Sequence, residues 1–345
     1  MAKRTWVGTG VLTIVLSLVL AACGGNSGTG GTPAAEPAGS DQSAQAGGDA
    51  GQASDKLQKV RYAPFNGVSG LAVRYGIEQG FFAEEGLDIE LVSTQNPIEA
   101  LTSKEVDVAD SATTGVIVAA GKGAPVKIIS SMFRTKGPFY LIARPEIKSV
   151  EELAGKKVGA AVLGTGLDVY TQSILQAHGL TKQDVTYLAT GVNEAAYASL
   201  TTGQVDATII HEPFASLAEV EGTGHILAQG WDYLPTFHTG VLASSDAFIE
   251  SSPELLEKLL RAYFKSQAYA KEHLEEYKAY FLEQVKVDPE AVDKAFEREA
   301  VLWENNPDVD RSALEDTQQI QVDLGFQDQI YPVDELLDLR FIPSK

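Results

Sequence analysis

Residues 80–91 read GFFAEEGLDIEL, and residues 150–159 read VEELAGKKVG. In the first stretch Leu87, Ile89 and Leu91 alternate with acidic residues. A period of two over this length predicts a half-buried strand. The second stretch leads into an apolar run over 157–162, which predicts another strand.

Outward from these two stretches, short apolar runs alternate with segments of helical pattern, many of them stopped by glycine. The predicted strands cover 60–63, 87–91, 106–109, 126–132, 139–143, 157–162, 185–188, 207–210 and 225–228, and the predicted helices between them cover 71–79, 97–103, 114–120, 167–178, 194–202 and 213–221. This alternation predicts an α/β fold built from βαβ units with mostly parallel sheets.

Beyond Asp246 the pattern becomes helical, with predicted helices over 253–269, 290–303 and 313–324. The first of these carries an apolar stripe that includes Leu256, Leu260 and Tyr263. A stripe of this kind predicts a helix that lies on a core.

One segment of seven residues recurs in similar form 99 residues later. Residues 101–107 read LTSKEVD, and residues 200–206 read LTTGQVD. Each copy covers the end of a predicted helix, a tight loop and the start of a strand. We interpret this helix–loop–strand connection, called the joint below, as one unit used once in each of two similar lobes. Coincidence within a window of seven residues is the alternative.

Composition limits the classes of function. The chain has 345 residues, with 47 acidic against 27 basic side chains and a formal net charge of −20. Such an acidic surface repels phosphate backbones, so we expect no nucleic-acid partner. A single cysteine, Cys23, excludes a disulfide framework, a cysteine-based zinc site and an iron–sulfur cluster.

The N-terminal region is predicted to be a targeting signal followed by a flexible linker. Residues 1–22 join a basic start, MAKR, to a short apolar stretch, which is typical of a signal peptide rather than a membrane span. Residues 24–55 contain no large apolar side chain. We therefore expect residues 23–55 to be a disordered linker, with a root-mean-square span of roughly 30 Å.

The junction LAAC at residues 20–23 resembles the lipobox of bacterial lipoproteins. The resemblance implies that cleavage makes Cys23 the new N-terminus and that its sulfur carries lipid, which anchors the protein to the outside of the bacterial cell membrane. General secretory cleavage that leaves a free thiol is the alternative.

The stretches 80–89, 121–126, 150–159 and 203–207 together resemble the type II periplasmic binding protein superfamily. Within it they look most like the branch of ABC-transporter solute receptors for sulfonates, nitrate, taurine and thiamine pyrimidines. The resemblance implies two α/β lobes with mixed sheets, joined by two crossovers. Lobe 1 is expected at 57–143 plus 240–345 and lobe 2 at 144–239, with a small solute held between them.

Ligands of open α/β sheets lie outside the carboxyl ends of the strands, near helix N-termini. The residues that follow the predicted strands are therefore the candidate solute contacts. They are Asn66, Ser69, Ser111, Thr113, Arg134, Tyr140, Thr165, Asp168, His211, Glu212, Phe214 and His238. The alternative for the hydroxyl and amide side chains is plain helix capping. The alternative for Arg134 is an ordinary surface ion pair.

The chemistry of these candidates leaves two ligand classes open. Arg134 and the helix N-termini favour an anion such as a sulfonate. Aromatic side chains together with Asp168, His211 and Glu212 favour a nitrogen heterocycle, such as a thiamine pyrimidine precursor or a flavin. The neighbours His211 and Glu212 lack the spacing of a metal triad, so we expect no metal ion.

Three functions compete at this stage. The first is a monomeric receptor that delivers a small solute to an ABC permease with its ATPase, without catalysis or a cofactor. The second is enzymatic, because fungal thiamine-pyrimidine synthases share the fold. Those enzymes use pyridoxal phosphate and a cysteine-rich iron motif, and the only cysteine here lies outside the predicted folded body. The third is a surface sensor of the same fold without transport.

Overall fold

A computed structural model of the chain describes residues 57–65, 67–133 and 136–343. All of these residues fall in one unit by their mutual contacts. The predicted signal peptide, the linker with Cys23, and the predicted contacts Asn66 and Arg134 lie outside the described residues.

Helices and strands alternate through most of the described chain. The strands are β1 (Gln58–Ala63), β2 (Leu87–Leu91), β3 (Val108–Ala112), β4 (Val126–Phe133), β5 (Phe139–Ala143), β6 (Lys157–Gly159), β7 (Thr186–Leu188), β8 (Ala207–His211), β9 (His225–Gln229) and β10 (Gly240–Ser245). The helices up to β10 are α1 (Leu71–Glu78), α2 (Phe81–Glu84), α3 (Pro97–Thr102), α4 (Thr113–Gly121), η1 (Glu151–Leu153), α5 (Gly166–Ala177), α6 (Glu194–Thr201), α7 (Phe214–Val220) and α8 (Gly230–Tyr233). The remaining helices are α9 (Asp246–Ser251), α10 (Pro253–Glu272), α11 (Leu274–Gln284), α12 (Pro289–Glu299), η2 (Ala300–Leu302), α13 (Arg311–Asp323) and α14 (Val333–Leu336).

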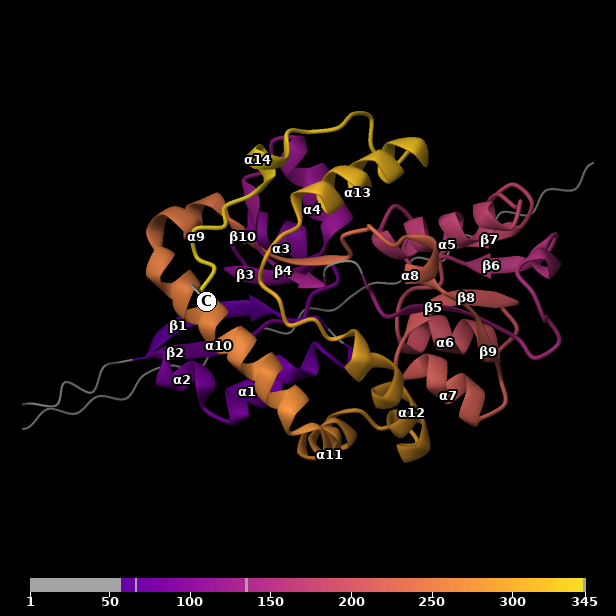
Figure 1. Cartoon of the computed structure of the whole chain (residues 1–345), viewed down its shortest axis with the longest axis horizontal. Coiled ribbons are helices and arrows are strands. Elements are labelled where there is room, and N and C mark those ends of the chain that lie inside the picture. The colour runs from indigo at the N-terminus through magenta and orange to yellow at the C-terminus, as the bar shows by residue number, and fades with distance from the viewer. Residues whose placement is uncertain (1–56, 66, 134–135, 344–345) are drawn as a thin grey trace, which may run out of the picture. The chain divides into compact units, whose positions relative to one another are not determined.

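The first sheet has the strand order β2-β1-β3-β10-β4 (Figure 1). Strand β1 runs parallel to both neighbours, with Val60 opposite Ile89 and Tyr62 opposite Val108. Strand β10 runs antiparallel to β3 and β4. The sheet is therefore mixed, with one reversed strand inserted among parallel ones.

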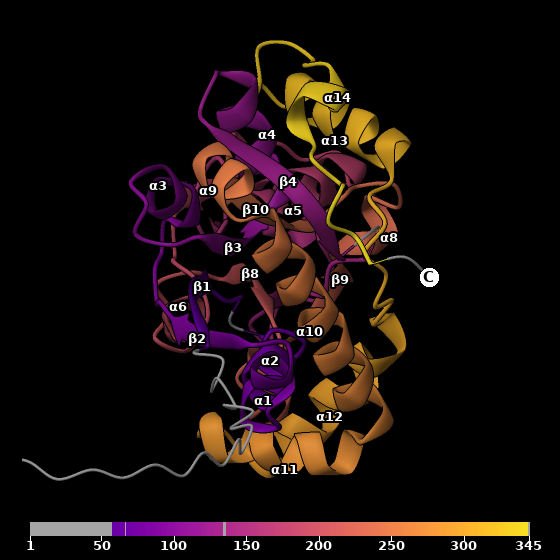
Figure 2. The same ribbon diagram turned by 90° about the vertical axis from the view of Figure 1, so that its left-hand side faces the viewer.

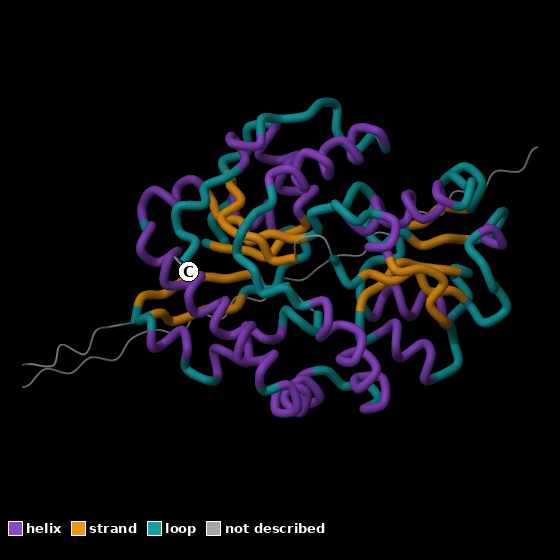
Figure 3. Tube along the Cα trace, in the orientation of Figure 1, coloured by secondary structure: helices purple, strands orange, loops and turns teal. Residues whose placement is uncertain are grey.

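The second sheet repeats this arrangement, with the order β7-β6-β8-β5-β9. Figure 3 shows the strands gathered in two separate groups with helices around each. Strand β6 is parallel to β7 and β8, and β5 is antiparallel to β8 and β9. Strand β5 enters this sheet after β4, and β10 returns to the first sheet after β9 and α8. The predicted α/β class with two mixed sheets and two crossovers is confirmed.

The repeated joint has the same geometry in both sheets. Lys104 and Gly203 occupy matching places in the two copies and have φ of 63° and 73°, respectively. Asp107 accepts a hydrogen bond from the backbone N–H of Arg61 at 2.8 Å, and Asp206 accepts one from that of Lys157 at 2.8 Å. Each aspartate thus ties the start of the central strand of its sheet, β3 or β8, to the parallel neighbour β1 or β6, as the internal repeat predicts.

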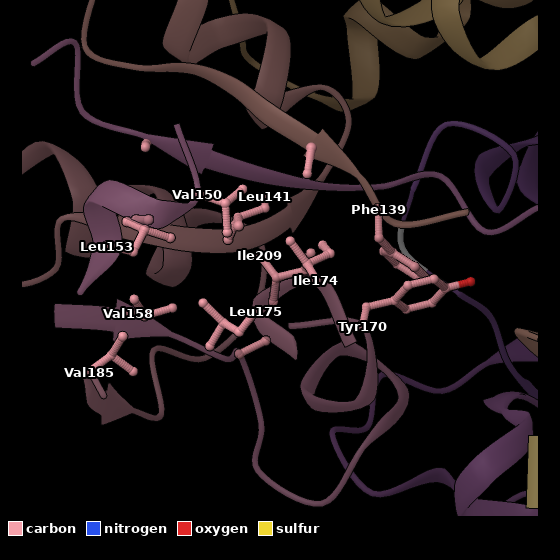
Figure 4. Packing of buried hydrophobic residues seen from close by; sticks show 14 of the residues in the cluster. Phe139, Leu141, Val150, Leu153, Val158, Tyr170, Ile174, Leu175, Val185 and Ile209 are labelled. Atoms are coloured by element: carbon pink, nitrogen blue, oxygen red, sulfur yellow. The ribbon is translucent and has the colours of Figure 1, made fainter. Parts of the chain in front are cut away.

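Each sheet has its own apolar core. In the second sheet α5 contributes Ile174 and Leu175 to a cluster with Leu141 and Ile209 of the strands, and its Tyr170 lies against Phe139 (Figure 4). In the first sheet α10 packs its buried stripe on the strands and also lies along α1 and α2 (Figure 2). Full burial of each such large side chain contributes roughly 1.5–3 kcal/mol.

The C-terminal helices contact elements of both sheets. Helix α13 packs against α4, and its Ile320 also contacts the core of the second sheet. Helix α12 packs against α7. In the part of the chain that the structure describes, no helix combines the length and the apolar character needed to cross a membrane.

The structure differs from the predicted elements at three strands. Strand β10 was not predicted, although all six of its residues are buried. Strand β3 extends to Ala112, so Ser111 lies within the strand rather than after it. Strand β6 ends at Gly159, because the chain turns at Ala161, which has a φ of 54°.

Candidate ligand-binding site

A pocket of about 380 Å³ opens where strands of both sheets end. Its walls come from the segments after β1, β2, β7 and β8 and from the end of α11. The lining residues are Gly67, Leu71, Arg74, Gln95, Asn193, Glu194, His211, Glu212, Pro213, Phe214, Phe281, Gln284 and Val285. The volume lies within the range of small-molecule sites.

Helix α1 supplies the basic group of the pocket. Gly67, Leu71 and Arg74 are spaced by four and three residues, so the two helical positions share the face that the preceding loop also lines. The Nε atom of Arg74 is buried and donates to no acceptor among the described residues. The guanidinium is therefore positioned at the pocket by its helix and not by a protein hydrogen bond at Nε.

The opposite wall combines aromatic rings and amides. Phe214 begins α7 and is buried, and Phe281 of α11 is buried as well. Asn193 stands directly before α6 with φ 53° and ψ −125°, and its buried Oδ1 accepts no hydrogen bond from any described residue. A residue held in this region of backbone conformation costs about 1–3 kcal/mol, and such strain concentrates at functional sites.

His211 ends β8 and lies among aromatic rings. Its ring centroid is 5.5 Å from that of Phe65 and 6.5 Å from that of Phe139. Its Nδ1 is 2.7 Å from the carbonyl oxygen of Glu212, so Nδ1 carries the hydrogen and donates to that oxygen. Burial lowers the pKa of His211, which keeps the ring neutral at neutral pH.

Glu212 follows His211 but its side chain faces away, toward α7 and α12. Its Oε2 accepts from the backbone N–H of Ser216 at 2.9 Å, and its Oε1 accepts from Ser216 Oγ at 2.9 Å and from Arg298 Nη1 at 3.0 Å. Burial raises the pKa of Glu212, and these bonds oppose that change. Burial also raises the pKa of the neighbouring Glu299, well above its ordinary value, and the charge of Glu212 adds to the effect.

A second group of polar side chains joins the two sheets beside the crossover before β10. Thr113 Oγ1 lies 3.1 Å from His238 Nδ1, and the backbone N–H of His238 donates to Thr317 Oγ1 at 2.7 Å. The N–H of Thr113 donates to the carbonyl of Thr239. This group therefore holds the start of α4, the crossover and α13 together.

A smaller recess of about 20 Å³ lies on the α10 side of the first sheet and is lined by Ser69 and Tyr263 among others. Buried hydroxyls of Ser69 and Tyr62 make no close hydrogen bond with a described residue. Asp110 accepts from the N–H of Phe65 at 2.8 Å through Oδ2. Its Oδ1 makes no close hydrogen bond with a described residue. Burial raises the pKa of Asp110 to about 7, against the lowering effect of the Tyr62 hydroxyl and the Phe65 N–H.

The structure brings His211, Glu212 and Phe214 together at the pocket, as the strand ends predict. The other seven candidates among the described residues do not line it: Ser69, Ser111, Thr113, Tyr140, Thr165, Asp168 and His238. Tyr140 is fully buried in the second sheet with its ring against Trp231, centroids 5.4 Å apart. Thr165 Oγ1 donates to the carbonyl of Val162 at 2.7 Å.

Asp168 is also held by its own lobe. Its carboxylate accepts from the N–H of Gly164 at 2.8 Å, from Gln172 Nε2 at 2.9 Å and from the hydroxyl of Tyr187 at 2.6 Å. These contacts occupy the carboxylate of Asp168 with groups of its own sheet. Ser111 is buried within β3 opposite Val241.

The sequence patterns did not predict Arg74, Asn193 or the contribution of α11 to the pocket. A signal for Arg74 was present: it is the only charged residue in the run LAVRYGI over 71–77. Among the described residues, no group of three or more histidine, cysteine, aspartate or glutamate side chains is placed to hold a metal ion.

Comparison with known proteins gives relatives of two kinds. The family model described as "NMT1/THI5 like" matches residues 71–277. The formylaminopyrimidine-binding protein of Halalkalibacterium halodurans is 29% identical over 208 residues, which cover 58% of this chain and 62% of that protein. The 4-amino-5-hydroxymethyl-2-methylpyrimidine phosphate synthase THI13 of Saccharomyces cerevisiae is 27% identical over 211 residues, 55% of this chain and 60% of the enzyme.

The chain thus spans less than two thirds of the length of both relatives. Among solved structures, the periplasmic aliphatic sulphonate binding protein SsuA of Escherichia coli superposes with a TM-score of 0.65 at 18% identity, covering 81% of this chain and 91% of that one. At this identity the similarity establishes the periplasmic binding protein fold.

Proposed function

Because the chain belongs to the NMT1/THI5-like family, we propose that it is an extracytoplasmic solute-binding receptor of an ABC importer. The observation that carries the proposal is the 380 Å³ pocket at the strand ends of two mixed sheets. Residues 57–143 with 240–345 and residues 144–239 form two lobes in this proposal, and hinge closure between them traps the ligand.

The ligand is a small organic molecule that leaves chemically unchanged. Its class is a sulfonate-like anion or a heterocycle of the thiamine-pyrimidine or flavin type. The pocket offers one guanidinium, amide groups and phenyl rings, which suit orientation of a ligand rather than proton transfer. Two acids line the pocket: Glu212 already accepts from Ser216 and Arg298, and Glu194 is exposed at the start of α6.

A thermal-shift screen of the purified chain against alkyl sulfonates, nitrate, pyrimidines and riboflavin tests this function. A ligand at 100 times its Kd stabilises the folded state by about 2.7 kcal/mol, so we expect a rise in Tm of several degrees. Leu71→Trp, which fills the pocket, should remove the rise. No shift with any compound would contradict the proposal.

The second candidate function is a pyrimidine synthase, which the similarity to the yeast enzyme favours. Chromatography of the compound that binds, before and after a long incubation with the protein, separates the two functions. A receptor returns the compound unaltered, whereas conversion to a product by wild type and not by Leu71→Trp would establish an enzyme.

Membrane attachment is a separate part of the proposal. Lipid on Cys23 would anchor a monomer outside the cell membrane, and the glycine-rich residues 24–55 would let it reach its permease. Cys23→Ala should move the protein from the membrane fraction to the soluble fraction of fractionated cells. Retention of the variant in membranes would exclude a lipid anchor at this cysteine.

A further inference from the structure

Ion pairing distinguishes one arginine from the others. Of the seven arginines that the structure describes, six form an ion pair with a carboxylate, namely Arg61, Arg144, Arg261, Arg298, Arg311 and Arg340. Arg74 forms none with any described residue. The chain has 47 acidic residues against 27 basic ones, so acidic partners are in excess.

Two acids on the helix of Arg74 or in the pocket lining have other partners, and a third, Glu194, lies exposed at the start of α6 and forms no ion pair with a described residue. Glu78, one turn further along α1, accepts from the hydroxyl of Tyr280 at 2.9 Å. Glu212 accepts from Arg298 and Ser216. The positive charge of Arg74 therefore faces the pocket without a neutralising carboxylate from these residues.

The buried part of the guanidinium also lacks an acceptor. Arg74 Nε is enclosed and donates to no described residue. A buried donor without a partner is costly, and a carboxylate, sulfonate or phosphate can accept from Nε and a terminal nitrogen at once. The fork geometry of the guanidinium matches such an anion better than it matches a single neutral acceptor.

The rest of the pocket has room for the body of such a molecule. Phe214 and Phe281 supply apolar rings, and the neutral His211 adds no competing charge. Asn193 Oδ1, which has no donor among the described residues, is available for an N–H or O–H of the ligand. The volume of 380 Å³ exceeds what an inorganic ion alone needs.

We propose that Arg74 is the anion-binding residue of this pocket and that the solute carries a carboxylate, sulfonate or phosphate attached to an apolar or planar body. This rests on the proposed receptor function and narrows its ligand to an anionic organic solute. Arg74 acts as a specificity-determining residue, because a neutral analogue leaves its charge without a partner.

Titration calorimetry with benzenesulfonate and the neutral benzenesulfonamide tests the assignment, since the two share a ring and differ in charge. Wild-type protein should bind the sulfonate at least about tenfold more tightly. Arg74→Gln should weaken sulfonate binding about 10- to 100-fold and change sulfonamide binding less than threefold. Arg74→Lys should retain part of the preference, because its point charge lacks the fork. Arg144→Gln, an arginine with its own acidic partner outside the pocket, is the matched control.

Equal losses for both probes, or no loss, in Arg74→Gln would overturn the assignment. If that variant does not fold, the salt dependence of wild-type binding decides: sulfonate affinity should fall from 0.05 to 0.5 M NaCl and sulfonamide affinity should not. If neither probe binds wild type but a pyrimidine or riboflavin does, the anion inference fails and the receptor survives. If no compound of either screen binds, both fail.

Discussion

The two sheets share an arrangement of strands and a joint, yet they differ in how a buried carboxylate in or just after the central strand is compensated. Glu212, directly after β8, is fully buried and accepts three hydrogen bonds, one of them from Arg298. Asp110, in β3, is also buried, but only one of its oxygens accepts a close hydrogen bond from a described residue. The first carboxylate has its charge compensated within the protein, and the second does not.

The difference has a structural consequence. Arg298 belongs to α12, so its bond to Glu212 and its ion pair with Glu219 fasten a C-terminal helix to α7 of the second sheet. Asp110 fastens only the loop after β1, through the N–H of Phe65. A compensated carboxylate therefore connects distant segments, whereas the uncompensated one makes the fold sensitive to pH.

The largest expected effect on stability comes from removing the positive charge that compensates Glu212. Arg298→Met keeps the length of the side chain and removes the charge, which leaves Glu212 buried beside Glu299 without a cation. Loss of one partner of a buried pair costs about 3–5 kcal/mol. Arg298 is partly exposed, with 29% of its side chain accessible, so we expect about 3 kcal/mol of lost unfolding free energy in urea titrations.

Arg340→Met is the matched control. Arg340 pairs with Asp338 at 2.6 Å, but 71% of its side chain is exposed, so the loss should stay below about 1 kcal/mol. Equal losses in the two variants would mean that the bond between Arg298 and Glu212 is no stronger than a surface pair, and the contrast between the sheets would disappear.

Asp110 gives the next largest effect, and its sign is opposite to that of an ordinary paired carboxylate. Its pKa is about 7 in the folded protein against 3.8 for an ordinary aspartate, so the folded state binds the proton more tightly. Stability from this group is complete below about pH 4 and is lost as the pH rises to about 7. Three pKa units correspond to at most about 4 kcal/mol, and we expect 2–4 kcal/mol.

Urea unfolding at several pH values between 4 and 8 measures this term as the difference between wild type and Asp110→Asn. The variant should gain stability relative to wild type as the pH rises, because it has no proton to lose. Asp232→Asn, which removes a carboxylate at an exposed position, is the matched control. A constant difference between wild type and Asp110→Asn would show that Asp110 titrates normally.

Much of the fold could be predicted because its signals are local. Alternation in 87–91, glycine stops and the copies at 101–107 and 200–206 each lie within a few residues of sequence. Strand β10 could not be found in this way. It is an inner strand whose two edges pair with β3 and β4, and all six of its residues are buried, so both of its faces are covered and polar and apolar residues do not alternate.

The site was less predictable because its members come from distant segments. Arg74 and Asn193 are more than one hundred residues apart, and nothing local indicates that both line one pocket. Tyr140 lies away from the pocket for a different reason. Adjacent residues of a strand face opposite sides, and β5 directs Phe139 toward His211 while Tyr140 enters the core beside Trp231.

The smallest effect tests whether the repeated joint is equivalent in the two sheets. Lys104 has a φ of 63° where its counterpart Gly203 has 73°, and a residue with a Cβ pays about 1 kcal/mol in this conformation. Lys104→Gly should therefore raise the unfolding free energy by up to about 1 kcal/mol, reduced by the freedom that glycine adds to the unfolded chain. Gly203→Lys should lower it by about 1 kcal/mol, since the new Cβ meets only the flexible tip of Arg144, at 2.9 Å. Urea titration of both variants should give opposite signs. The same sign in both would mean that the two joints share a backbone conformation, but that the cost of a positive φ does not determine the stability of both variants.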